Sequence, residues 1–450
     1  MSSIAEKIAE SVKDAGGRTF YVGGFVRDRL LGIGSKDVDI EVHGIEPDRL
    51  YAILETLGEP LIFGRSFGVY ALKGEDIDIA MPRRERATGR GHRDFEIEVD
   101  PFIGTCAAAK RRDFTINALM EDVLTGEIID HFGGREDLSC GVIRHIDDAS
   151  FVEDPLRVLR AAQFAARFGF TVDPSTIGLC RGIDLRALSR ERVEEELKKA
   201  LLKADKPSIF FETLRSMDQL DCWFPEMKPL IGLEQDPVFH PEGDVWTHTM
   251  EVVDRAAGYR DRAADPFRFM LLALTHDFGK AVTTEEKNGR IHAYGHETEG
   301  MPLINNFIKR ITNEKDVIDY VDNMVPLHMR PNVSAYSRPS LKSTNRMFDE
   351  AKVPADLVWF AAADRPVFAG ADEFSGDTEF LLERLKAYEE TMAKPYVAGR
   401  DLIEAGLEPS EDFAEILAYA HKLRLAGIEK ESALKQTLAY ARKYRKERVK

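Results

Sequence analysis

The sequence predicts an α+β protein in which a small mixed head is followed by regions that are almost entirely helical. Two observations favour this fold class. Short β-branched runs alternate with helical stretches over roughly the first 135 residues, and from about Asp147 onward the apolar positions follow helical periodicity. With 450 residues, of which 44% are hydrophobic, the chain is long enough for two to four domains with cores of their own.

The individual elements follow in order. An amphipathic helix over residues 1–17 comes first, and later helices are predicted at 25–31, 47–57, 155–169, 191–203 and 207–220. Strands are predicted at 18–22, 37–42, 68–73, 76–80 and 126–130. Breaks between domains are expected near 145–150, 233–244 and 365–376, where the pattern changes or Pro and Gly accumulate.

Composition and charge narrow the class of protein further. Four widely spaced cysteines fit neither a zinc knuckle nor a small disulfide framework, so a reducing cytoplasm is the expected location. We find no apolar run of membrane-spanning length and no standard secretion signal, which argues against a membrane protein. The formal net charge of −16 opposes nucleic-acid binding, yet basic side chains gather at 83–93, 110–112 and 442–450.

A glycine pair near the amino terminus suits phosphate binding. Gly23 and Gly24 follow the first predicted strand and open a helix, so backbone N–H groups can approach a phosphate closely. Arg27, one turn into that helix, can act as a charged clamp. An ordinary strand-to-helix turn is the alternative, because a Gly-Gly pair alone is a weak signal.

Carboxylates at strand spacing predict a metal site. In KDVDIEV, Asp37, Asp39 and Glu41 share one face of a strand because strand side chains alternate. Mg²⁺ prefers oxygen ligands, and two such ions can activate an attacking hydroxyl and neutralise a leaving pyrophosphate. A solvent-exposed polar strand face is the alternative. The strand 76–80, with Asp76 and Asp78 in the same alternation, offers the third carboxylate that such a site needs.

Five motifs in order, over about residues 18–230, carry a resemblance to a known family. YVGGFVRDRLLG, KDVDIEV, IDIAMPRRE, KRRDFTINAL and EDPLRVLRAAQFAARFG together resemble the class II nucleotidyltransferases of the polymerase-β superfamily, the tRNA CCA-adding enzymes and bacterial poly(A) polymerases. The resemblance implies Mg²⁺ ligation by Asp37 and Asp39, with Asp78 as the third catalytic carboxylate. It implies that the nucleotide is bound by Gly23, Gly24, Arg27, Arg112, Asp113, Asn117, Asp154, Arg157 and Arg160.

Nucleotide choice has a physical explanation in EDPLRVLR. Asp154 precedes Pro155, which suits a helix N-cap, but Asp154 and Arg157 are also three residues apart and can present side chains on one side. Cytosine and adenine each offer an amine donor beside a ring-nitrogen acceptor, which a carboxylate and a guanidinium can pair. Guanine and uracil place a carbonyl opposite the carboxylate, so the pair can select C and A.

A histidine cluster predicts a second metal site. His248, His276, Asp277 and Asp364 meet the H…HD…D pattern and resemble the HD phosphohydrolase superfamily over about residues 240–370. Imidazole and carboxylate ligands suit a divalent transition metal such as Ni²⁺, Mn²⁺, Co²⁺ or Fe²⁺ that activates water for phosphoester hydrolysis. Phosphatase and 2′,3′-cyclic phosphodiesterase activity are implied by the resemblance. His296 and His328 could complete a second metal position.

The resulting prediction is a cytoplasmic enzyme that adds CCA to the 3′ end of tRNA from CTP and ATP, with tRNA held by its acceptor arm. The expected division is a catalytic head at 1–147, a neck at 148–235, an HD-type body at 236–370 and a tRNA-binding tail at 371–450. Alternatives are a poly(A) polymerase, an enzyme adding only CC or only A, a hydrolase whose head binds RNA, or a non-enzymatic RNA-binding protein. A monomer and a homodimer both remain open.

Three further features bear on these alternatives. The segment 83–101 resembles the mobile loop of full CCA-adding enzymes, which favours addition of all three nucleotides. Gln163 stands where the family usually continues its arginine spacing, and Cys106 to Ala109 stand where acidic residues are more common. Neither departure removes a catalytic group, but both leave room for altered nucleotide preference.

Overall fold

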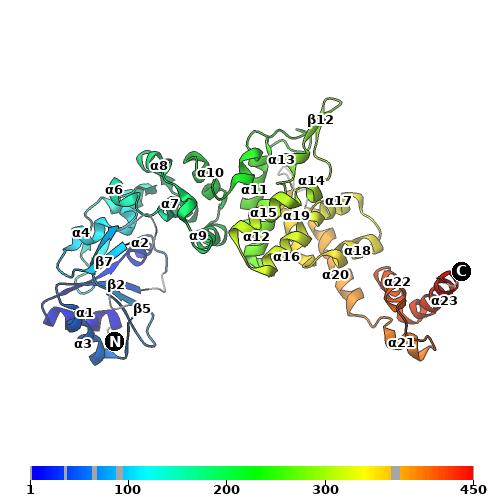
Figure 1. Cartoon of the computed structure of the whole chain (residues 1–450), viewed down its shortest axis with the longest axis horizontal. Coiled ribbons are helices and arrows are strands. Elements are labelled where there is room, and N and C mark those ends of the chain that lie inside the picture. Colours follow the sequence, from blue (N-terminus) through cyan, green and yellow to red (C-terminus); the bar gives the residue numbers. More distant parts are fainter. Residues whose placement is uncertain (1–2, 35–37, 63–67, 88–94, 366–374, 449–450) are drawn as a thin grey trace. The chain divides into compact units, whose positions relative to one another are not determined.

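A computed structural model describes residues 3–34, 38–62, 68–87, 95–365 and 375–448. The chain forms two compact units, Met1–Trp223 and Phe224–Lys450 (Figure 1). The first contains an α+β part and a helical part, and the second is nearly all helical, as the sequence predicts. No helix among the described residues combines the length and the apolar character needed to cross a bilayer.

A seven-stranded mixed sheet is the framework of the α+β part. The strand order is β3-β4-β5-β2-β1-β8-β9, in which β2 and β5 run parallel and the other neighbours antiparallel. The strands are β1 (Arg18–Val22), β2 (Val38–His43), β3 (Pro60–Ile62), β4 (Val69–Leu72), β5 (Ile77–Ala80), β8 (Met120–Asp122) and β9 (Ile128–Ile129). All five strands predicted in this part are present, and β2 lies at the centre of the sheet.

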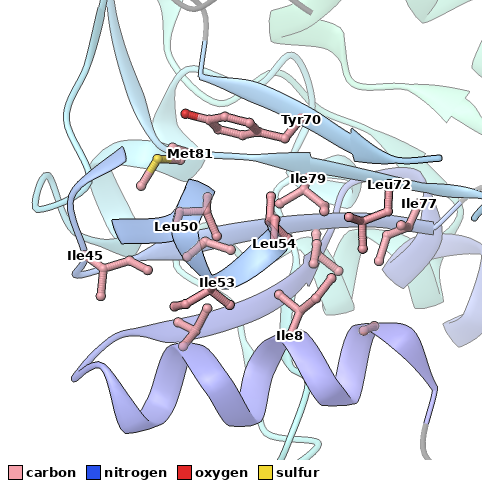
Figure 2. Packing of buried hydrophobic residues seen from close by; sticks show 14 residues of the cluster. Ile8, Ile45, Leu50, Ile53, Leu54, Tyr70, Leu72, Ile77, Ile79 and Met81 are labelled. Carbon is pink, nitrogen blue, oxygen red and sulfur yellow. The ribbon is translucent and has the colours of Figure 1, made fainter. Parts of the chain in front are cut away.

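One face of the sheet is covered by α1 (Ile4–Asp14) and α3 (Pro47–Leu57). Ser3 and Glu6 form a capping box that starts α1. Figure 2 shows Ile8 of α1 among side chains of α3 and the strands, and Ile40 and Val42 of β2 join this buried cluster. The apolar side of β2 thus anchors the sheet, which turns the alternating carboxylates of the same strand to the opposite face.

The opposite face carries a smaller cluster and the segments that build the site. Phe20, Val22 and Met120 pack there against Ala109 and Ala118. The helices of this part are α2 (Gly24–Leu30), α4 (Thr105–Lys110), a 3₁₀ turn at Thr115–Asn117 and α5 (Gly134–Cys140). The segment 83–101 contains β6 (Arg83–Ala87) and β7 (Phe95–Val99), which pair as an antiparallel hairpin that the sequence prediction did not include. Residues 88–94 lie outside the described residues.

The helical part of the first unit is built around α7 (Leu156–Phe168), which packs against α9 (Arg190–Lys203) and α10 (Ser208–Ser216). Gly169 ends α7 in the left-handed conformation, at φ +67°. The remaining elements of this part are β10 (Val142–Ile143), α6 (Asp148–Phe151), β11 (Thr171–Val172) and α8 (Pro174–Cys180).

The second unit begins with a bundle of helices. They are α11 (Val245–Ala257), α12 (Pro266–Thr275), α13 (Lys280–Thr283), α14 (His296–Glu299), α15 (Met301–Ile311), α16 (Lys315–Met324), α17 (Met329–Ser337), α18 (Leu341–Glu350) and α19 (Pro354–Asp364). A hairpin of β12 (Glu285–Lys287) and β13 (Arg290–His292) interrupts them, which the sequence prediction missed. Its turn is Asn288-Gly289, both at positive φ, a pairing typical of a tight hairpin.

The last helices form a separate core. They are α21 (Gly399–Glu404), α22 (Phe413–Leu425) and α23 (Lys430–Arg448), whereas the preceding α20 (Ser375–Ala393) packs mainly against α17, α18 and α19. Leu402, Ile416 and Ala433 belong to its buried cluster. The stacked rings of Tyr419 and Tyr440, 4.1 Å apart, join α22 to α23.

Candidate active site and metal centre

Strand β2 places the candidate catalytic carboxylates. Asp39 and Glu41 share the face opposite the apolar side chains of the strand, and Asp39 lies beside Asp78 in the parallel register of β2 and β5. Neighbouring strands lie about 4.8 Å apart, and register partners on parallel strands point to the same face of the sheet. The two carboxylates can therefore reach one cation. Asp76 lies one residue before β5, ahead of the described register, which begins at Val38 and Ile77. Asp37 lies outside the described residues.

Glu41 anchors two arginines of the KRRD segment. Its side chain is buried and accepts from Arg111 Nη2 at 3.3 Å, Arg112 Nη2 at 3.5 Å and His43 Nε2 at 2.9 Å. Burial alone would raise the pKa of Glu41, but His43 and the two arginines lower it to about 2. The ionised carboxylate therefore holds both guanidinium groups beside the sheet, a role that the sequence prediction did not include.

The glycine turn approaches the same arginines. Gly23 has φ +64°, and a Cβ at that position would lie 3.0 Å from Arg112 Nη1. A larger residue there would be strained and would displace the guanidinium. Arg27, one turn into α2, is buried; its Nη1 donates to Asn117 Oδ1 at 2.6 Å, and its Nη2 pairs with Asp28 at 2.6 Å.

Asp113 joins the head to the neck helix. Its Oδ2 accepts from Arg160 Nε at 2.7 Å and pairs with Arg160 Nη2 at 2.6 Å, while its Oδ1 accepts from Asn117 Nδ2 at 2.9 Å. Burial opposes the ionised form, but Arg160 and Asn117 keep the pKa of Asp113 below its usual value. Asp113 thus orients the two groups that the sequence assigns to the nucleotide.

These segments surround a cavity of about 480 Å³. Its wall has nine basic side chains but only three carboxylates, which suits an anionic ligand. Arg112 Nε and Gln163 Nε2 are buried donors without a hydrogen-bond partner among the described residues, so the ligand should also be rich in acceptors. The predicted residues that line the cavity are Gly23, Gly24, Arg27, Asp39, Arg112, Asp113, Asn117, Asp154, Arg157 and Arg160.

Asp154 and Arg157 lie at the neck side of this cavity, and each is held by other groups. Arg157 donates to the carbonyls of Ser150 and Arg111, both at 2.8 Å. Asp154 pairs with Arg192 of α9 at 2.9 Å and accepts from the Leu156 backbone N–H at 3.1 Å. Helix α7 begins at Leu156, two residues after Asp154, and its N-cap is Pro155.

The four histidines of the second site converge from different helices. Nε2 of His248 lies 3.4 Å from Nε2 of His276, and Nε2 of His296 lies 3.2 Å from Nε2 of His328. Asp277 connects the two pairs: its Oδ2 lies 3.2 Å from His276 Nε2 and its Oδ1 lies 3.2 Å from His296 Nε2. The structure therefore brings together all four residues of the predicted HD pattern and the two additional histidines.

Asp364 completes the first histidine pair. Its Oδ1 lies 3.2 Å from His248 Nε2 and 3.5 Å from His276 Nε2, and its Oδ2 accepts from Asn332 Nδ2 at 3.2 Å. Two groups of three ligand atoms result, His248–His276–Asp364 and Asp277–His296–His328. Each group has the mixed nitrogen and oxygen donors that divalent transition metals accept.

The outer nitrogen of each histidine has a partner that fixes the ring. Nδ1 of His276, His296 and His328 donates to the backbone carbonyl three residues earlier, at 2.9, 2.8 and 2.7 Å respectively. Carbonyl oxygen only accepts, so Nδ1 carries a proton, and in the neutral ring the Nε2 lone pair faces the centre. Nδ1 of His248 instead donates to Glu242 Oε1 at 2.7 Å.

This arrangement fits a bound cation. Burial lowers the pKa of His328 to about 3, so its ring is neutral and its Nε2 lone pair faces His296; burial also opposes a proton on His296, but the hydrogen bond to Asp277 raises the pKa of that ring. Burial also lowers the pKa of His248, but hydrogen bonds to Asp364 and Glu242 raise it to about 9. The carboxylates thus hold a proton on His248 where a metal would bind, and metal binding would release it.

Glu242 is expected to strengthen metal binding through His248. Glu242→Gln removes the charge that orients and polarises the imidazole, and metal affinity should fall about 10- to 100-fold. The measurement is the dissociation constant for Mn²⁺ or Ni²⁺ from titration against a chelator. Glu251→Gln, on the exposed side of α11 beside Arg255, is the matched control. Equal affinities for the two variants would contradict the prediction.

Comparisons with known proteins find matches to two domain families. Residues 19–144 match the model of the poly A polymerase head domain, and residues 245–365 match that of the HD domain. The multifunctional CCA protein of Xanthomonas oryzae pv. oryzae is 35% identical over 408 residues, covering 87% of this chain and 94% of that protein. The chain belongs to the family of multifunctional CCA proteins. It is a nucleotidyltransferase with a fused HD domain, and both domains imply dependence on divalent metal ions.

Other relatives extend this result. The multifunctional CCA protein of Actinobacillus pleuropneumoniae serotype 5b is 37% identical over 327 residues, which cover 71% of this chain and 77% of that protein. A Thermotoga maritima CCA-adding enzyme complexed with tRNA shares the fold at a TM-score of 0.65 and 22% identity, covering 96% of this chain and 94% of that one. An apo CCA-adding enzyme gives a TM-score of 0.68 at 22% identity, with 97% and 95% covered.

Four functional residues escaped the sequence prediction, each for its own reason. Glu41 was recognised only as a member of the acidic strand face, because its partners lie some 70 residues away. Glu242 precedes His248 by six residues in a loop, and Arg192 reaches Asp154 from another helix. Lys280 had a local signal: it follows Asp277 by three residues, and its Nζ lies 2.7 Å from Asp277 Oδ2.

Proposed function

We propose that this chain adds C, C and A to the 3′ end of tRNA, using CTP and ATP. The cavity with Asp39 at one side and Asp154 and Arg157 at the neck side carries the proposal, because it combines a metal-binding carboxylate, cations for a triphosphate and a base-reading pair. The relatives are named CCA proteins, and solved structures with the same fold include complexes with tRNA, ATP and CTP.

In the proposed reaction the terminal 3′ hydroxyl of tRNA attacks the α-phosphate of the bound nucleotide, and pyrophosphate leaves. Mg²⁺, held by Asp37, Asp39 and Asp78, would activate the hydroxyl and stabilise the charge that develops on the phosphates. Arg27, Arg112 and other cations of the wall neutralise the triphosphate. Asp154 accepts from the amine of C or A while Arg157 donates to the neighbouring ring nitrogen.

The HD centre is proposed to hydrolyse phosphoesters, with phosphatase or 2′,3′-cyclic phosphodiesterase activity on damaged RNA ends. A divalent transition metal such as Ni²⁺, Mn²⁺, Co²⁺ or Fe²⁺ would supply an activated water there. His248, His276, Asp277 and Asp364 would hold it, and His296 and His328 would complete a second position with Asp277.

The proposed division of labour follows the predicted domains. A catalytic head at 1–147 and an HD body at 236–370 are supported by the two family models, which fall inside these limits. A nucleotide-selecting neck at 148–235 is supported by the place of Arg157 and Arg160 on α7. The tail at 371–450, with its basic end, would contact the acceptor arm of tRNA in the cytoplasm, as a monomer or homodimer.

One assay tests the proposed addition. Purified protein is given tRNA transcripts that end before CCA, after C and after CC, with each nucleoside triphosphate separately and in mixture. Extension that stops at CCA is the expected result. Long A-tails would identify a poly(A) polymerase, which the head-domain model also allows, and a stop at CC would identify a partial enzyme.

A further inference from the structure

Arg192 holds the carboxylate that is proposed to read the base. Its Nη2 donates to Asp154 Oδ1 at 3.1 Å and to Asp154 Oδ2 at 2.9 Å, and both side chains are about 70% shielded from solvent. Arg192 comes from α9, a different helix from the one that Asp154 precedes. A long-range ion pair of this kind further constrains a side chain that its own helix holds through the Leu156 N–H alone.

The hydrogen bonds on Asp154 leave one direction open. A carboxylate offers about four lone-pair positions, two on each oxygen. Oδ1 accepts from both the Leu156 N–H and Arg192, whereas Oδ2 accepts from Arg192. An acceptor position therefore remains on Oδ2, and the ion pair decides where it points.

Arg157 is oriented by separate contacts, so the two base-reading residues are fixed independently. Its Nη1 and Nη2 each donate one hydrogen to a backbone carbonyl, those of Ser150 and Arg111. Two of its five N–H donors are used in this way, and the others remain for a base. Neither contact involves Arg192, so a change at Arg192 acts on the carboxylate and leaves the guanidinium in place.

We propose that Arg192 is a positioning residue for nucleotide selection, an inference that rests on the proposed function of Asp154. A carboxylate that cannot rotate repels the carbonyl of uracil or guanine at the position where cytosine and adenine present an amine. Without Arg192, Asp154 keeps its bond to the Leu156 N–H but can turn its second oxygen away from a wrong base. The free-energy penalty against UTP and GTP then falls by more than the favourable interaction with CTP and ATP does.

Two other roles for Arg192 would give different results. If Arg192 instead competes with the base for Asp154, removing it would free the carboxylate and raise kcat/KM for CTP and ATP. A purely structural role in joining α7 to α9 would lower kcat/KM for all four nucleotides by the same factor.

Single-nucleotide incorporation separates these roles. We compare Arg192→Ala, Arg192→Lys and the control Arg186→Ala, an exposed arginine paired with Asp184 in the same unit. For each protein, kcat/KM is measured for CTP and UTP on tRNA lacking CCA, and for ATP and GTP on tRNA ending in CC. Circular dichroism and thermal melting establish that each variant is folded.

In Arg192→Ala we expect the UTP/CTP and GTP/ATP ratios to rise about 10- to 100-fold, with a smaller fall in kcat/KM for CTP and ATP. Arg192→Lys, which keeps the charge without the fork, should recover part of the discrimination. Unchanged ratios, an equal loss for all nucleotides or faster use of CTP would overturn the proposal. A wild-type protein that fails to add CCA would instead refute the proposed function itself.

Discussion

Asp39→Asn is expected to lower the rate of nucleotide addition at least about a thousandfold, because it removes a charge that would hold a catalytic cation. The side chain keeps its size, and β2 is anchored by its apolar face, so folding should be preserved. The HD centre belongs to the other compact unit, and its metal content should be unchanged. The measurements are single-turnover extension of tRNA and the metal bound per chain.

Neighbouring carboxylates provide the control for this prediction. Asp78 is the register partner of Asp39, so Asp78→Asn should also impair addition strongly. Asp76 is exposed and precedes the strand, so Asp76→Asn should change the rate less than about threefold. Equal effects at Asp76 and Asp78 would show that the register does not identify the third carboxylate.

Asp277→Asn should have the second large effect, on the HD centre. Asp277 contributes an oxygen to each histidine pair, so its loss weakens both groups of ligands together. We expect metal affinity to fall more than about a hundredfold and phosphoester hydrolysis to disappear, with CCA addition retained. Elemental analysis of bound metal and hydrolysis of a 2′,3′-cyclic nucleotide are the measurements.

Two histidine variants refine that result. His328→Ala alters only the group that contains His296, so it should lose part of the metal that Asp277→Asn loses completely. His292→Ala, in the hairpin strand β13, lies outside both groups and should retain all of it. Loss of nucleotide addition in Asp277→Asn would argue against two independent sites.

Periodic and local patterns in the sequence predicted much of this protein. The alternation in KDVDIEV placed Asp39 on the face opposite Ile40, because strand geometry dictates it and the core confirms it. The H…HD…D spacing identified four residues that the fold brings to one point.

Partners from distant segments could not be predicted in this way. Glu41 lies 70 residues from Arg111, and Asp154 lies 38 residues from Arg192, so no spacing rule connects them. The paired strands within 83–101 were missed because RRERA is charged almost throughout and lacks the alternation that FEIEV shows. The Asn288-Gly289 turn, by contrast, carried a clear local signal for a hairpin.

The backbone contacts of the HD histidines bear on how this centre tolerates sequence change. His276, His296 and His328 take their Nδ1 partners from the carbonyls of Ala273, Ala293 and Val325. Substitutions at those three positions keep the carbonyl, so neutral drift there leaves the ring orientation intact. Among these four histidines, His248 takes its partner from a side chain, Glu242. Among the contacts that orient the four rings, the one open to a side-chain substitution is therefore that of Glu242, in the loop that precedes α11.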